Sequence, residues 1–323
     1  MERLITKPDN EEHWLQMREA NLNSTDASCL YGANPYQSEF ELYHQKKGNI
    51  ESQFTETERV IIGRHVERGI AKAFQQVTGW KCVQYKPYIT IPELRIGSSY
   101  DFIIRSGPYK HWLLEIKNVD FLIFRDQWVV EGEGDGEAPL HIEIQAMHEA
   151  LVADAPGVII LACVGGNTLK WIARERDQAM CDAMLERYAQ FWDAVDNDRE
   201  PTVDYQRDMD AIMALYNKAE VGAVYDATED TEVSAHIANY VDWGKDIKKL
   251  EGLRSSAKAE VLQKIGEVSK VEGEDHRISC GVVKENEGKL ITKDMVGQRT
   301  GMRKSFRMFR ATVKTKKEDK NDG

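Results

Sequence analysis

The sequence predicts an α/β fold in which helices flank a central mixed sheet. Two observations support this prediction. The spacing of apolar residues changes along the chain from helical to alternating and back, and the segments follow one another as helix, strands, helix, strands and helix. With 323 residues the chain is long for one compact domain, so we expect a main domain with a C-terminal helical and β extension.

Short elements open the chain. The first helix should begin near Asn10 and carry Arg18. The capping residues at 23–27 predict a second helix. A loop that contains glycine and proline follows at 32–36, and a short helix should run through residues 40–43.

A longer helix and three strands come next. Apolar residues recur at helical spacing from residue 56 to 78, and Gly79 stands where a C-cap glycine is common. The apolar positions of this helix are Ile62, Val66, Ile70, Phe74 and Val77. The change of period that follows predicts strands at 82–91, 96–104 and 112–119.

The second half of the main domain repeats this order. Residues 131–137 alternate acidic residues with glycine, which is typical of a solvated, flexible loop. A helix is predicted at 140–153, a buried strand at 158–164, a second strand at 168–173 and a last helix at 177–195.

The main domain is predicted to span residues 1–200, and residues 201–275 are predicted to form an acidic helical segment. Apolar side chains keep a helical spacing from residue 243 to 268, which predicts one long amphipathic helix. We expect this helix to pack against residues 205–220 of the same chain. A coiled-coil surface for a partner is the alternative.

Residues 276–323 are predicted to form a basic, β-rich third segment. Strands are expected near 278–283 and 307–313, and the last six residues should be disordered. The stretch from Arg303 to Arg310 interleaves cations with aromatic residues, which suits a DNA backbone and its bases. Alternatively it is a strand whose basic face pairs with the acidic middle of the chain.

Charge is distributed unevenly. The net charge is -11, but residues 182–275 hold twenty-two acidic against eleven basic residues, whereas residues 276–317 hold twelve basic against three acidic ones. Because the sign changes along the chain, the overall charge does not exclude DNA binding.

Composition argues against several classes of protein. No stretch approaches 18 consecutive apolar residues, so we expect no membrane-spanning helix. The first residues carry no apolar signal region, so we expect the protein in the cytoplasm. The five cysteines are scattered and form no CxxC pair, which argues against a disulfide framework and against a zinc or iron–sulfur site.

Three residues of the predicted strands carry the candidate chemistry. Glu115 and Lys117 are two apart on one strand and therefore share a face, and a hairpin can bring Asp101 beside Glu115. Two carboxylates can hold Mg²⁺, which polarises a phosphodiester and lowers the pKa of a bound water. A lysine beside the attacking water can orient it and stabilise developing negative charge. A surface salt bridge between strands is the plain alternative, and it is common.

Other residues favour the metal site over that salt bridge. Glu67 shares the apolar face of its helix, where a carboxylate usually has a partner. Gln145 lies early in a helix and can support the site or hold the lysine. Arg18 and Thr25 place a guanidinium and a hydroxyl beside a helix start, which suits a terminal phosphate.

In their order along the chain, these residues resemble the lambda-exonuclease/YqaJ branch of the PD-(D/E)XK nucleases. The resemblance covers roughly residues 10 to 175. The matching motifs are Trp14-x3-Arg18, Thr25-Asp26-Ala27, Gly32-x-Asn34-Pro35-Tyr36, Lys47-Gly48, Gly63-x3-Glu67, Asp101, Glu115-Ile116-Lys117 and Gln145.

The resemblance implies a role for each residue. Asp101, Glu115 and Ile116 would be the Mg²⁺ ligands, with Mn²⁺ as an alternative ion, and Lys117 would act on the attacking water. Glu67 would help to hold the metal or its water, and Gln145 would support the lysine. The 5′-phosphate of a DNA end would be bound by Arg18, Thr25 and Ser99.

The resemblance also implies a function. We expect a metal-dependent 5′-to-3′ exonuclease that acts on linear double-stranded DNA ends in phage-type recombination, in the cytoplasm of a bacterial host. A single-strand-annealing recombinase is the implied partner, and a homo-oligomer the implied assembly. Thr25 stands where serine is more usual, and the longer tail leaves a ring assembly in doubt. The alternatives are a structure-specific or single-strand endonuclease of the same fold, and a non-catalytic DNA-binding module.

Overall fold

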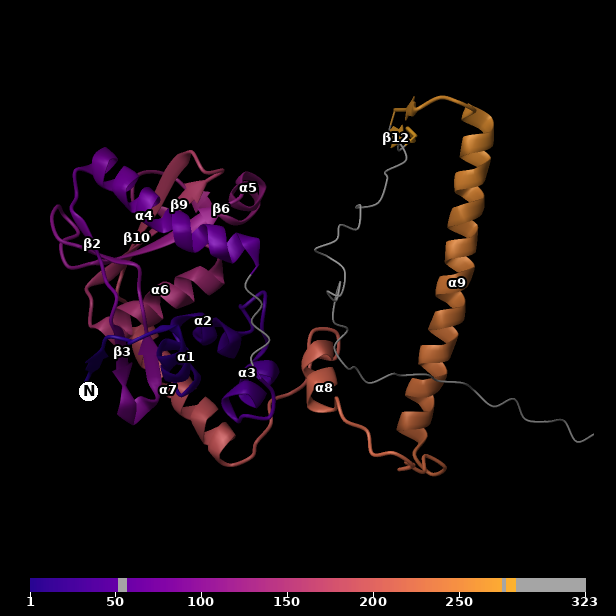
Figure 1. The fold of residues 1–323 in the computed structure, drawn as a ribbon, viewed down its shortest axis with the longest axis horizontal. Coiled ribbons are helices and arrows are strands. Elements are labelled where there is room, and N and C mark those ends of the chain that lie inside the picture. The colour runs from indigo at the N-terminus through magenta and orange to yellow at the C-terminus, as the bar shows by residue number, and fades with distance from the viewer. Residues whose placement is uncertain (52–56, 275–276, 283–323) are drawn as a thin grey trace, which may run out of the picture. The chain divides into compact units, whose positions relative to one another are not determined.

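The computed structural model describes residues 1–51, 57–274 and 277–282. It confirms the predicted class, a mixed α/β fold with a central mixed sheet flanked by helices (Figure 1). The chain forms two compact units, Met1–Leu215 and Tyr216–Gly323. The division into three segments at residues 200 and 275 stays a prediction.

The helices of the first unit begin at capping residues that the sequence displays. Main-chain N–H groups in the first turns of α1, α3, α4 and α7 donate to the side chains of Asn10, Ser38, Thr57 and Asp177. The helices are α1 (Glu11–Glu19), α2 (Ser24–Ala27), α3 (Glu39–Lys46), α4 (Glu58–Thr78), α5 (Phe121–Gln127), α6 (Leu140–Ala153), α7 (Gln178–Asp196) and α8 (Met209–Leu215).

The main sheet has five strands. In spatial order they are β10 (Thr168–Glu175), β9 (Gly157–Val164), β6 (Leu113–Val119), β5 (Phe102–Ile104) and β2 (Cys82–Gln84). The β6 and β9 strands run parallel and the other neighbours are antiparallel, so the sheet is mixed. The crossover from β6 to β9 contains α6, as a parallel pair requires.

Two predicted strands were wrong in extent. The predicted strand 82–91 is β2 in the main sheet and β3 (Tyr88–Ile91) in a second sheet, and 96–104 is likewise divided into β4 (Ile96–Ser98) and β5. Pro87 lies at the first break, where it offers no N–H for a ladder. The second sheet is completed by β1 (Leu4–Thr6), which pairs with β3 and was not predicted.

The segment before α6 also differs from expectation. Val129–Val130 (β7) and Gly136–Glu137 (β8) pair as a short hairpin, so the predicted flexible loop 131–137 ends in a strand. The unpredicted helix α5 precedes this hairpin, and the side chain of Asp120 caps it by accepting from the Leu122 N–H.

Helices cover both faces of the main sheet. On one face Leu114 and Ile116 of β6 belong to a core cluster with Ile70 and Phe74 of α4. The outer apolar positions of α4 are not buried: Ile62 is 52% and Val77 76% exposed. Burial of the central positions fixes α4 against the strands, since each fully buried large apolar side chain contributes about 1.5–3 kcal/mol.

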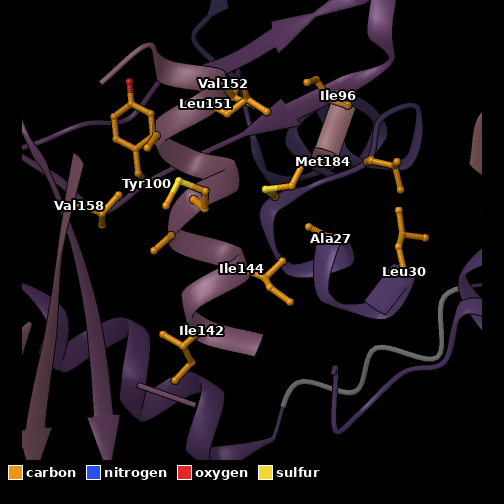
Figure 2. Packing of buried hydrophobic residues seen from close by; sticks show 14 of the residues in the cluster. Ala27, Leu30, Ile96, Tyr100, Ile142, Ile144, Leu151, Val152, Val158 and Met184 are labelled. Carbon is orange, nitrogen blue, oxygen red and sulfur yellow. The ribbon is translucent and has the colours of Figure 1, made fainter. Parts of the chain in front are cut away.

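The other face packs against α6, which is buried along most of its length. Figure 2 shows this helix between the strand that carries Val158 and the segment that carries Ala27 and Leu30. Glu115 and Lys117 alternate with Leu114 and Ile116 and therefore lie on the α6 side of β6. This arrangement positions the candidate site.

The second unit contains a long helix, as predicted, but the helix begins and ends earlier than the predicted span 243–268. It is α9 (Thr231–Ile265), and β11 (Lys270–Glu272) and β12 (Arg277–Ser279) pair after it. Its packing against residues 205–220 stays a prediction. The predicted strand at 307–313, the aromatic-basic stretch from Arg303 to Arg310 and the last six residues lie outside the described residues.

Candidate active site

Asp101 and Glu115 meet where the β5–β6 ladder ends. Phe102 pairs with Leu114, so the next residue of each strand, Asp101 and Glu115, falls at the same level. Asp101 accepts a hydrogen bond at Oδ2 from the Ile116 N–H at 2.9 Å. Beyond this point β6 pairs only with β9. The Asp101 carboxylate therefore takes the place of a main-chain acceptor from β5.

Glu115, Lys117 and Gln145 form a closed triangle of hydrogen bonds. The Lys117 ammonium donates to Glu115 Oε1 at 2.7 Å and to Gln145 Oε1 at 2.9 Å. The Gln145 amide nitrogen donates to the same Glu115 Oε1 at 2.7 Å. The strand and α6 are therefore joined through three polar groups, of which Glu115 is 6% and Gln145 8% exposed.

Glu67 belongs to the same electrostatic cluster. Burial and the Glu115 carboxylate raise the pKa of Glu67 to about 7, against the lowering effect of Lys117. Burial, Glu115 and Glu67 raise the pKa of Asp101 well above its ordinary value, although the Ile116 N–H favours the charged form. The raised pKa values thus reflect burial and the mutual repulsion of carboxyl groups that lie close together.

The sequence interpretation missed Glu149, which lies one turn after Gln145 on α6. Its Oε1 accepts from the Gln145 amide nitrogen at 2.9 Å, and the residue is fully buried. Burial and the Glu115 carboxylate raise the pKa of Glu149 well above its ordinary value. The available signal was a glutamate four residues, and so one helical turn, after Gln145.

Lys117 is held as a cation. Burial alone would lower the pKa of its ammonium group, but the Glu115 carboxylate outweighs burial, with help from Glu149 and Asp101, and the pKa is raised. The side chain therefore acts as a donor of hydrogen bonds and of positive charge, and not as a free base.

Arg18 and Thr25 meet beside the start of α2. The Arg18 guanidinium donates to Thr25 Oγ1 at 3.1 Å and stacks on the Trp14 ring, with 4.7 Å from Cζ to the ring centroid. The neighbouring Asp26 pairs with Lys46 at 3.0 Å. Burial would raise the pKa of Asp26, but Lys46 and Arg18 outweigh it and lower that pKa.

Thr25, Lys117 and Gln145 line a pocket of about 390 Å³, so the structure brings these three predicted residues to one cavity. Arg18, Glu67, Asp101 and Glu115 are not among its lining residues. Ser99 is half-buried in the link between β4 and β5 and does not line this pocket. Further lining residues that the sequence interpretation missed are Arg59, Asn118, Ile123, Gln127, Trp128 and His141.

The donor set fits a divalent cation. Among the described residues, no group of three or more His, Cys, Asp and Glu side chains is already arranged to hold a metal. Asp101 and Glu115 nevertheless offer hard oxygen ligands side by side, and their crowding with Glu67 is relieved by added positive charge. Ile116 has an apolar side chain that is 6% exposed, so only its main-chain carbonyl could serve as a ligand.

A family model matches part of this region. Residues 13–156, less than half of the chain, match the model of the YqaJ-like viral recombinase domain. This stretch is similar to a YqaJ-like domain. It contains Arg18, Thr25, Glu67, Asp101, Glu115, Lys117 and Gln145, and also Glu149.

Individual relatives are distant. The chain is 25% identical over 208 residues to "Uncharacterized protein YqaJ" of Bacillus subtilis (strain 168), a stretch that covers 60% of each protein. Among solved structures it is similar to the alkaline exonuclease LHK-Exo from Laribacter hongkongensis, alone and in complex with dAMP. Both matches have 15% identity and a TM-score of 0.46, and they cover 63% of this chain and all of the other.

None of the described helices combines the length and the apolarity that crossing a membrane needs.

Proposed function

We propose that this chain is a divalent-metal-dependent deoxyribonuclease that degrades linear double-stranded DNA from its 5′ ends in phage-type recombination. The observation that carries the proposal is the triangle of Glu115, Lys117 and Gln145 beside Asp101. A surface salt bridge would need neither the buried amide nor the second carboxylate.

The roles of the residues follow from their contacts. Asp101 and Glu115 would hold Mg²⁺, or Mn²⁺ in its place, with the Ile116 carbonyl as a third ligand and Glu67 close by. When bound, the ion supplies polarisation of the phosphodiester and a lowered pKa for water. Lys117 donates hydrogen bonds, so it orients the attacking water and stabilises charge on the phosphate oxygens.

Substrate recognition is assigned to Arg18 and Thr25, of which Thr25 lines the pocket. Arg18, held by Thr25 and Trp14, presents a guanidinium to a 5′-phosphate, and charge-assisted hydrogen bonds of this kind are strong. Ser99 would contribute only if the DNA reaches the link before Asp101. Thr25 lines the same cavity as Lys117, so a DNA end bound at Thr25 enters the cavity of the proposed catalytic lysine, which favours cleavage near an end.

The partners follow from the proposed reaction. Degradation of one strand from a 5′ end leaves a 3′ single strand, which a single-strand-annealing recombinase can use. We therefore propose such a recombinase as a partner and a homo-oligomer as the assembly that keeps the nuclease on DNA.

The test is a time course on DNA of different ends. In Mg²⁺ the chain should consume 5′-phosphorylated linear duplex and release nucleotides from the 5′-labelled strand. It should leave closed circular duplex and single-stranded circles intact and be inactive in EDTA. Cleavage of circles would instead establish an endonuclease, and binding of linear DNA without cleavage would establish a non-catalytic DNA-binding module.

A further inference from the structure

Glu149 is a buried acid that the architecture of α6 does not require. It is 0% exposed, and its Oε2 has no hydrogen-bond partner among the described residues. An unpartnered polar atom in the core lowers stability by about 1–3 kcal/mol. An apolar side chain of similar size would pack here at no such cost, so stability does not explain the glutamate.

The contacts of the Gln145 amide indicate what Glu149 does. An amide nitrogen has two hydrogens, and here one is donated to Glu115 Oε1 at 2.7 Å and the other to Glu149 Oε1 at 2.9 Å. The amide oxygen accepts from Lys117 at 2.9 Å. With both hydrogens engaged in different directions, the plane of the amide is fixed. Without Glu149 the amide would keep its contacts with Glu115 and Lys117 but lose one of its three anchors, the only one that lies on α6 itself.

We propose that Glu149 is a positioning residue that locks the Gln145 amide and thereby holds Glu115 and Lys117 in their working places. The proposal rests on the proposed function, in which these two residues serve the metal and the attacking water. Both the carboxylate and the neutral acid offer an acceptor oxygen to Gln145, so the geometry does not depend on the charge of Glu149.

Two substitutions of Glu149 distinguish the role of its acceptor oxygen from that of its side-chain size. Glu149→Leu keeps the size and removes the acceptor. Its kcat should fall roughly ten- to hundredfold, the effect typical of losing a group that orients a metal ligand. Its KM for DNA ends should not change, because Arg18 is held by Thr25 and Trp14 and not by the Gln145 amide. Glu149→Gln can present its amide oxygen to Gln145 and should keep kcat within about threefold of the parent.

A control variant and a double variant test whether Glu149 acts on kcat through Gln145. Val152→Ala removes volume from a fully buried position of the same helix, outside the hydrogen-bond network. It should lower the Tm by several degrees and leave kcat unchanged below the Tm, whereas Glu149→Leu should lower kcat without lowering the Tm. Gln145→Leu combined with Glu149→Leu should lose no more kcat than Gln145→Leu alone, because one residue acts through the other.

Mn²⁺ binding measured by calorimetry gives a readout that needs no turnover. Glu149→Leu should weaken Mn²⁺ binding roughly tenfold, and Glu149→Gln and Val152→Ala should leave it unchanged. Parental kcat and Mn²⁺ affinity in Glu149→Leu, or losses that multiply in the double variant, would overturn the positioning role alone. A parent chain that binds Mn²⁺ with this dependence on Glu149 but hydrolyses no DNA would overturn the proposed function and keep the positioning role.

Discussion

Asp101 accepts a hydrogen bond from the main-chain N–H of Ile116 at the point where β5 and β6 separate. One carboxylate oxygen thus completes the strand, and the other remains for a ligand. The charge of Asp101 can therefore be removed without removing its hydrogen bond to the strand.

Asp101→Asn should keep the fold and lose the activity. The asparagine oxygen can still accept from Ile116, and the repulsion among Asp101, Glu115 and Glu67 is reduced, so the Tm should be equal or higher. Loss of a charged metal ligand should lower kcat by roughly a thousandfold, or about 4 kcal/mol. Melting curves and single-turnover hydrolysis measure both effects. An active Asp101→Asn variant would contradict the ligand assignment.

The stability of the metal-free chain and the stabilising effect of added metal should change with pH in opposite directions. Glu67, with a pKa of about 7, Asp101 and Glu149 all titrate above their ordinary range in the folded chain. The folded state therefore binds protons more tightly than the unfolded state. The free energy of unfolding of the metal-free chain should fall as pH rises from about 5 to 8.

Mg²⁺ binds the ionised carboxylates, so its stabilising effect should grow over the same pH range. Thermal melts in EDTA and in Mg²⁺ at several pH values test both pH dependences, that of the metal-free chain and that of the Mg²⁺ effect. Glu67→Gln should flatten the metal-free slope, and Glu58→Gln, an exposed position of the same helix, should not. A Mg²⁺ effect that is the same at both ends of the range would count against the site.

Arg18→Ala should weaken the binding of DNA ends that carry a 5′-phosphate. Loss of hydrogen bonds to a charged group is worth about 1.5–3 kcal/mol, so KM for 5′-phosphorylated duplex should rise roughly ten- to hundredfold. KM for 5′-hydroxyl duplex should change little. Arg199→Ala removes an exposed guanidinium that pairs with Asp193 and not with Thr25, and it controls for overall charge. Equal effects on both kinds of end would refute the 5′-phosphate assignment.

Gly97→Ala should lower the stability of the fold by displacing Tyr88, which contacts the residue before α2. A Cβ at Gly97 would overlap the Tyr88 ring and hydroxyl, and that hydroxyl donates at 2.6 Å to Asn23, the residue before α2. Overpacking of this kind typically destabilises by about 1–3 kcal/mol. Urea unfolding measures the loss. Gly244→Ala in α9, where a Cβ meets nothing within 4 Å, should not destabilise the chain.

Local patterns predicted the elements that carry the site. The two-residue spacing of Glu115 and Lys117 was enough to place them on one face, and turn and strand signals were enough to bring Asp101 beside them. The helix at 140–153 was also predicted, but its burial was not. These features depend on neighbours in sequence.

Features that depend on distant pairing could not be read in the same way. The strand β1 has three residues and exists because it pairs with β3, and the split of 82–91 depends on which sheet each half joins. Glu149 was missed because a glutamate on a helix is usually exposed, and only the packing of α6 makes this one buried. The pocket wall likewise joins α2, β6 and α6, which meet only in the fold.

Hydrolysis by Glu115→Ala and Lys117→Ala tests the central claim most directly. The parent chain and both variants are supplied with 5′-phosphorylated linear duplex in Mg²⁺, and DNA binding is followed separately by fluorescence anisotropy. Both variants should bind DNA ends as the parent does and cleave them roughly a thousandfold more slowly, because each removes several kcal/mol of transition-state stabilisation. If both cut as fast as the parent, the hydrogen-bonded triangle beside Asp101 is not the active site.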